Sequence, residues 1–126
     1  MTRLLANIKV VFFLYLVLLL LLHLLPINGK ESALNNNYTI GIRWDYIGHF
    51  LAFGFLSFVG NVFSATKKYS ILTTNLLLLL LAASLEGLQY ILPYRAFNLN
   101  DLLANGIGIG LGGVVFVFIK TRKSLA

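Results

Sequence analysis

Residues 99–119 read LNDLLANGIGIGLGGVVFVFI, a long apolar run that carries one acid, Asp101, close to its start. Asn105 follows Asp101 by four residues, so both side chains lie on one face of a helix. An ionisable group at membrane depth is costly, and it normally faces a protein interior or a water-filled cavity. The stretch therefore predicts a membrane-spanning helix whose polar face is turned toward other helices.

The composition indicates that the whole chain belongs in a membrane. Its 126 residues are 59% hydrophobic and 11% charged, whereas roughly a quarter of the residues in a soluble domain are charged. The formal net charge of +6 comes from lysines and arginines at the ends of apolar segments, which is typical of membrane borders. The chain has no cysteine, which excludes disulfides, thiol nucleophiles and thiolate metal sites. We therefore expect the lipid bilayer as a partner and no nucleic acid.

Four apolar segments approach the roughly twenty residues needed to cross the hydrocarbon core, at about 6–26, 46–65, 70–92 and 99–119. The first could be a secretory signal, but residues 24–28 (LLPIN) lack the small residues of a cleavage site, so we interpret it as an uncleaved span. A polar, asparagine-rich connection runs from Ile27 to about Ile42, and the later connections are short. The predicted fold is all-α, a small four-helix transmembrane bundle that forms a single domain over residues 1–126.

The basic residues predict the orientation of this bundle. Short connections make successive helices antiparallel, so one side collects seven of the ten lysines and arginines: Arg3, Lys9, Lys67, Lys68, Lys120, Arg122 and Lys123. The positive-inside bias then places both termini in the cytoplasm. We predict that a label at Asn36 reacts from outside the cell, whereas a label at Lys67 or Lys68 reacts only from the cytoplasmic side. Labelling of Asn36 only from the cytoplasm would contradict this topology.

The predicted topology brings the unusual polar residues to the outer side. His49 follows Asp45 by four residues, and Gln89 follows Glu86 by three, so each pair shares a helix face. At the helical rise per residue, His49 lies about 6 Å deeper than Asp45, and Glu86 lies about 9 Å below the outer border. Arg95 falls in the outer connection between the last two spans. We predict one outward-opening site formed by Asp45, His49, Glu86, Gln89, Arg95, Asp101 and Asn105.

A purely structural role is the alternative for these residues. Polar side chains in membrane helices often hydrogen-bond only with one another, at about 0.6 kcal/mol per bond. This interpretation suits Gln89 and Asn105 as well as a binding role does. It suits Glu86 less, because a buried carboxylate costs more than an amide, and an amide would serve for packing.

The remaining polar and small residues favour packing. His23 has no polar partner at helical spacing, and we interpret it as an interfacial residue rather than a ligand. We assign Asn75 and Ser84 to helix packing. The last span also carries small-xxx-small pairs, which let helix backbones approach closely and favour packing within the bundle over self-dimerisation. These pairs are Gly106 with Gly110, and Gly108 with Gly112.

The order of the polar residues resembles that of a known family. Residues 45–53 (DYIGHFLAF) are similar to the first signature of VanZ-like membrane proteins. One departure is Tyr46, where the family often has lysine. The resemblance implies a multi-pass protein of the bacterial cytoplasmic (inner) membrane, in a family named for a protein linked to teicoplanin resistance. The second signature resembles the spaced set Glu86, Gln89, Pro93, Arg95, Asp101, Asn105, Gly108 and Gly112.

The first function that fits is a non-enzymatic cell-envelope protein. It would bind an anionic or lipid-linked headgroup, such as that of a cell-wall precursor, and modulate susceptibility to teicoplanin-type glycopeptide antibiotics. Arg95 could recognise phosphate, because a guanidinium matches phosphate oxygens with paired hydrogen bonds. The surrounding carboxylates would then need a counter-charge, which a divalent cation with oxygen ligands could supply.

The second function is an intramembrane enzyme that acts on a phosphate-bearing or lipid-linked envelope precursor. His49 would act as general base, Glu86 and Asp101 are the other catalytic candidates, and Arg95 would stabilise developing charge. Proton-coupled transport is a third alternative, but four helices per chain make a narrow pathway unless the protein forms a homo-oligomer.

Overall fold

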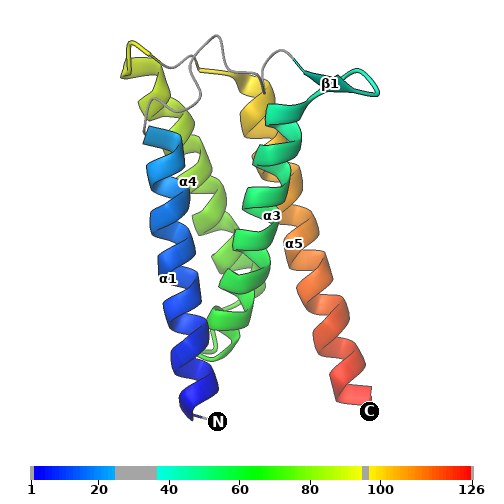
Figure 1. Cartoon of the computed structure of the whole chain (residues 1–126). Coiled ribbons are helices and arrows are strands. Elements are labelled where there is room, and N and C mark those ends of the chain that lie inside the picture. The colour runs from blue at the N-terminus through cyan, green and yellow to red at the C-terminus, as the bar shows by residue number, and fades with distance from the viewer. Residues whose placement is uncertain (1, 25–36, 95–96, 126) are drawn as a thin grey trace.

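A computed structural model of the chain describes residues 2–24, 37–94 and 97–125 (Figure 1). Most of these residues lie in four helices: α1 (Thr2–Leu24), α3 (Trp44–Ala65), α4 (Ile71–Ile91) and α5 (Leu99–Leu125). Each helix contains a stretch that is long and apolar enough to cross a membrane. The predicted all-α fold with four transmembrane helices is confirmed, and the protein is a multi-pass membrane protein.

The helix boundaries differ from the predicted ones mainly at the two ends of the chain. Helix α1 begins at Thr2 rather than near residue 6, and α5 continues beyond residue 119 to Leu125. Lysine and arginine are good helix formers, so a helix does not have to end where its apolar run ends. Ser70 marks the start of α4 sharply, because its hydroxyl accepts a hydrogen bond from the backbone N–H of Thr73 at 3.0 Å.

The helices run antiparallel to their neighbours in sequence, and both chain ends lie at the same end of the bundle (Figure 1). We call this the terminal end, and we call the opposite end, which carries residues 37–43, the hairpin end. The assignment of the terminal end to the cytoplasm stays a prediction from the basic residues.

A short β-hairpin precedes α3 within the connection that the sequence analysis left without regular structure. Strand β1 (Tyr38–Thr39) pairs antiparallel with β2 (Ile42–Arg43). Both turn residues have positive φ, 54° at Ile40 and 77° at Gly41, as a type I′ turn requires. Glycine adopts this conformation freely, but a β-branched residue rarely does. The hairpin leads directly into α3 and so sets the start of that helix.

The most extensive helix contact is between α3 and α5, and it brings their backbones together. A Cβ atom added at Gly108 would overlap the carbonyl oxygen of Phe50, and one added at Gly112 would overlap the carbonyl oxygen of Gly54. The hydroxyl of Ser57 lies 2.8 Å from the carbonyl oxygen of Ile109 across the same contact. The packing role predicted for the last span therefore holds for one glycine pair, Gly108 and Gly112.

The other predicted glycine pair does not form such a backbone contact among the described residues. A Cβ added at Gly110 would meet nothing within 4 Å, and one added at Gly106 would only touch the side chain of Leu79 at 3.7 Å. Gly110 instead borders a mostly apolar groove of about 500 Å³ between α4 and α5. The groove extends from Ile71 to Thr121, so it lies toward the terminal end.

Helix α1 is attached mainly by aromatic and apolar side chains. The ring of Phe12 stacks on Phe63 with centroids 5.5 Å apart, and the hydroxyl of Tyr15 donates to the carbonyl oxygen of Ala52 at 3.0 Å. Only 11% of the residues in the apolar stretch of α1 are buried, compared with 33% in the apolar stretches of α3 and α5. Helix α1 is therefore the most loosely held helix of the bundle. The buried apolar core consists of Leu19, Phe53, Leu56, Leu78, Ala82, Leu85 and Ile109.

A polar network joins α3 and α4 in the half of the bundle nearer the terminal end. The amide oxygen of Asn75 lies 3.0 Å from the hydroxyl of Ser57 and accepts from the amide of Asn61 at 2.8 Å. Ser84 hydrogen-bonds within its own helix, to the carbonyl oxygen of Leu80 at 2.8 Å. Asn75 thus makes contacts between helices, as predicted, whereas the exposed Ser84 bonds to its own helix, so its predicted packing role stays a prediction.

The close contact between α3 and α5 yields a direct prediction. Gly108→Ala should destabilise the protein by about 1–3 kcal/mol, the usual cost of overpacking, because the new methyl group meets backbone atoms that cannot rotate away. Gly110→Ala on the same helix is the matched control, and it should be neutral or slightly stabilising because alanine favours helix. Thermal unfolding in detergent measures both, and equal midpoints for the two variants would contradict the proposed contact.

Candidate functional site

All four helices deliver polar side chains to the half of the bundle near the hairpin end. His23 is the penultimate residue of α1, and Asp101 lies in the first turn of α5. His49 and Glu86 lie roughly 7.5 Å inside the nearest ends of their helices, at the usual rise per residue. We call the group formed by these side chains and Asn105 the buried cluster: His23, Glu86, Asp101 and Asn105, which are buried, and His49, which is partly buried.

His49 connects α3 to α5 through both of its ring nitrogens. Its Nδ1 lies 3.0 Å from the amide oxygen of Asn105, and its Nε2 lies 3.8 Å from Oδ2 of Asp101. An amide oxygen only accepts hydrogen bonds, so Nδ1 carries the proton in this contact. The other nitrogen, Nε2, is therefore the acceptor atom of the neutral ring, and it faces the carboxylate side of the cluster.

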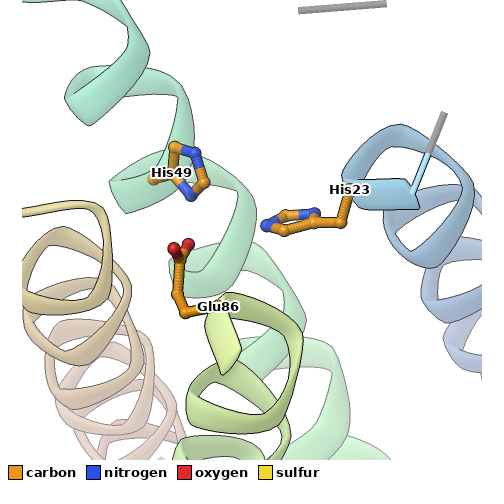
Figure 2. A group of neighbouring side chains, drawn as sticks. All are labelled: His23, His49 and Glu86. Atoms are coloured by element: carbon orange, nitrogen blue, oxygen red, sulfur yellow. The ribbon is translucent and has the colours of Figure 1, made fainter. Parts of the chain in front are cut away.

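Glu86 of α4 completes the cluster together with His23 of α1. The Glu86 side chain is fully buried, and His23 is 7% exposed. Figure 2 shows the carboxylate of Glu86 pointing toward the ring of His49, with the ring of His23 directed at both. One ligand atom from each of these three residues lies within 4.8 Å of the other two. The rings of His23 and His49 are perpendicular, with centroids 5.1 Å apart.

A rim of polar side chains links the cluster to the hairpin end. The amide of Asn98 donates to Asp101 at 3.1 Å and lies 3.5 Å from the hydroxyl of Tyr46, and the amide of Asn100 lies 3.3 Å from the same hydroxyl. Asp101 in turn faces His49. Polar groups thus follow one another from the exposed end of the bundle inward to the buried cluster.

Asp45 lies at the hairpin end of the bundle, where it forms an ion pair with Arg43. One carboxylate oxygen of Asp45 accepts from Nε of Arg43 at 3.1 Å and from the backbone N–H of Tyr46 at 3.0 Å. The guanidinium of Arg43 also lies over the ring of Tyr46, 4.6 Å from its centroid. Partial burial lowers the pKa of Arg43, but the hydrogen bond and charge of Asp45 outweigh it, so the pKa is raised and the side chain is a permanent cation.

The predicted site residues therefore divide into four groups. The structure brings His49, Glu86, Asp101 and Asn105 together, whereas the described contacts of Asp45 are at the border. Gln89 is buried on α4, about one helical turn from Glu86 toward the hairpin end. Arg95 lies outside the described residues. The outward-opening cavity that the sequence predicts around these residues stays a prediction.

His23 is the member of the buried cluster that the sequence reasoning missed. It has no polar partner at helical spacing, and that absence suggested an interfacial residue. The signal that could have found it is its position, since an imidazole near the end of a leucine-rich span is itself expensive at membrane depth. Its polar neighbours come from α3 and α4, so the pattern of its own helix contains no trace of them.

The cluster combines groups that can bind a cation or exchange protons. Imidazole changes its charge near neutral pH, and carboxylates accept or donate protons in many active sites. Electrostatic interactions are also stronger within a low-dielectric helix bundle than in water. The fold and this cluster define a class, a small multi-pass membrane protein with a buried histidine and carboxylate centre near one end.

A family comparison makes this class specific. The chain matches the family model described as VanZ/LLP1 over residues 11–120, and it therefore belongs to that family. The resemblance to VanZ-like proteins that the sequence analysis drew from its polar residues is confirmed. Neither the curated proteins nor the solved structures contain a match to this chain.

Proposed function

We propose that this VanZ-like protein binds an anionic or lipid-linked headgroup of the bacterial envelope at the hairpin end of its bundle. The site would face outward from the cytoplasmic membrane, as the basic residues predict. Binding of the protein to the headgroup would alter the access of teicoplanin-type glycopeptides to cell-wall precursors and so modulate susceptibility to these antibiotics.

The observation that carries this proposal is the inward series of polar groups from the hairpin end. It begins at the hydroxyl of Tyr46, passes through Asn98 and Asp101, and reaches His49 and Glu86. Helices that only pack against one another do not require such a series, because each buried polar group costs free energy in the membrane. A headgroup that enters from the outer membrane surface would meet amides and a hydroxyl first and the charged cluster last.

Cations at the same end favour an anionic ligand. The guanidinium of Arg43 lies beside Tyr46. VanZ-like proteins often have a lysine at the position of Tyr46. Arg95 follows α4 in sequence by a few residues and is the candidate for paired hydrogen bonds to phosphate. The amides of Asn98 and Asn100 add uncharged donors.

An intramembrane enzyme is the second candidate function, and one contact favours it. Nε2 of His49 lies 3.8 Å from Asp101, with the ring held from its other side by Asn105. An imidazole oriented in this way can act as a general base toward a bound water or hydroxyl. Identification of lipids that copurify with the protein, followed over time, separates the two functions, because an enzyme converts its lipid whereas a binding protein returns it unchanged.

Glu86→Gln tests whether the buried carboxylate has a function. The amide preserves the shape and the hydrogen-bonding capacity, so thermal stability should stay near that of the wild type. Binding of the copurifying lipid, measured by native mass spectrometry, should fall at least about tenfold, because the amide would no longer hold a cation that bridges the carboxylate to an anionic headgroup. Ser84→Ala is the matched control on the same helix, because Ser84 is exposed and, among the described residues, its hydroxyl bonds within α4 to the carbonyl oxygen of Leu80. Full lipid binding by Glu86→Gln would assign Glu86 to helix packing.

Arg95→Lys tests recognition of the anion. Lysine keeps the charge but cannot reproduce the planar pair of donors, so we expect lipid binding to weaken about tenfold. Arg122→Lys at the terminal end is the matched control and should bind as the wild type does. Equal lipid binding by both variants would remove the main support for phosphate recognition. If cells that express Arg95→Lys are as susceptible to glycopeptides as cells that express the wild type, the link to resistance would be contradicted.

A further inference from the structure

We propose that His23, His49 and Glu86 form a binding site for a divalent transition metal ion, with Zn²⁺ as the best-fitting occupant. The three residues come from α1, α3 and α4, and each offers one ligand atom within 4.8 Å of the other two (Figure 2). Two imidazoles and one carboxylate are a recurring zinc-binding set, which leaves a fourth position for water or another ligand. This proposal goes beyond headgroup binding and does not depend on it.

The hydrogen bonds of the two histidines point to a metal site. Nδ1 of His23 lies 2.9 Å from the carbonyl oxygen of Leu19, and Nδ1 of His49 lies 3.0 Å from the amide oxygen of Asn105. Both acceptors are oxygens, so each Nδ1 carries the proton and each Nε2 presents a lone pair in the neutral ring. Metal-binding histidines show this arrangement, in which one ring nitrogen donates to a carbonyl or carboxylate while the other binds the ion.

The charges of the cluster also fit a divalent ion. In their ionised forms, Glu86 and Asp101 would contribute two negative charges, and Asp101 lies beside His49 at 3.8 Å. A single Zn²⁺ would neutralise both, which lowers the cost of placing carboxylates within a membrane. Asp101 is held by the amide of Asn98, and because it lies beside Nε2 of His49 it is positioned to approach the ion.

The ligand atoms select the kind of metal. Mg²⁺ and Ca²⁺ prefer shells made wholly of oxygen, whereas imidazole nitrogen favours Zn²⁺ and its neighbours in the transition series. The acids of the sequence suggest a divalent cation with oxygen ligands, whereas the geometry offers two nitrogens and one carboxylate. The chain has no cysteine, so thiolate ligands do not compete with this set.

The site needs a small contraction to bind zinc. Bond lengths near 2.0–2.2 Å and tetrahedral angles place zinc ligands roughly 3.3 Å apart, compared with the 4.8 Å limit for the three residues here. Rotation of the side chains and a slight shift of α1, the most loosely held helix, would close this difference. Metal binding would then join α1 to α3 and α4 near the hairpin end.

Metal content of the purified protein tests the proposal. The full chain is purified in detergent with an affinity tag that contains no histidine, stripped with a chelator and titrated with Zn²⁺ or with Co²⁺. We expect one Zn²⁺ per chain by elemental analysis, the visible absorption of four- or five-coordinate Co²⁺, no such uptake of Mg²⁺, and a higher unfolding temperature with Zn²⁺.

Three variants remove the ligands one at a time. His23→Asn and His49→Asn keep an amide donor near the position of Nδ1 but remove Nε2, and Glu86→Gln removes the negative charge. Each should weaken Zn²⁺ binding at least about tenfold, since even loss of a residue that only orients a ligand has that effect. Asp45→Asn is the control, because Asp45 pairs with Arg43 at the border, and it should retain the metal.

The outcomes separate this proposal from the proposed function. A folded wild-type protein that takes up no Zn²⁺, or variants that bind it as tightly as the wild type, would overturn the metal site. If one variant does not fold, the Co²⁺ spectrum of the wild type still tests the site. A spectrum that shows no nitrogen ligation of Co²⁺ would contradict the assignment. Zn²⁺ uptake without any copurifying lipid would support the metal site and count against headgroup binding.

Discussion

The backbone contact between α3 and α5 is the constraint on which the polar half of the molecule depends. Gly108 and Gly112 have no side chain to hold the two helices apart, so the carbonyl groups of α3 lie directly against α5. His49 can therefore reach Asp101 and Asn105 at hydrogen-bonding and ion-pairing distances. A wider spacing would separate the imidazole from both partners and remove contacts that offset the cost of polar groups at membrane depth. The packing of small residues in one part of the helix thus determines the chemistry in another.

The sequence predicts the fold well because its signals are strong and local. Apolar length, charged borders and antiparallel connections suffice for four transmembrane helices. The same reasoning brings His49, Glu86, Asp101 and Asn105 to one level, because each has a polar partner on its own helix face. The hairpin was missed because Ile40 occupies a turn position that a β-branched residue rarely takes.

The parts of the site that could not be predicted depend on contacts between helices. His23 has its cluster partners on α3 and α4, and the contacts of Arg43 with Asp45 and Tyr46 do not follow from its position at the end of an apolar segment. The spacing of the glycines is equally regular in both pairs, yet only Gly108 and Gly112 face α3. The rotation of each helix about its own axis decides which side chains and glycines face a neighbouring helix. That rotation follows from the packing of all four helices together.

The groove between α4 and α5 has a consequence for the way the protein is placed among lipids. It lies toward the terminal end and is mostly apolar, whereas the buried cluster lies toward the hairpin end and is charged. Each half of a bilayer core is about 15 Å thick, so a lipid molecule confined to one leaflet would lie at the level of one of these features but not of the other. The buried cluster therefore lies at the level of one leaflet and the apolar groove at the level of the other. Reversing the protein in the membrane would exchange the two.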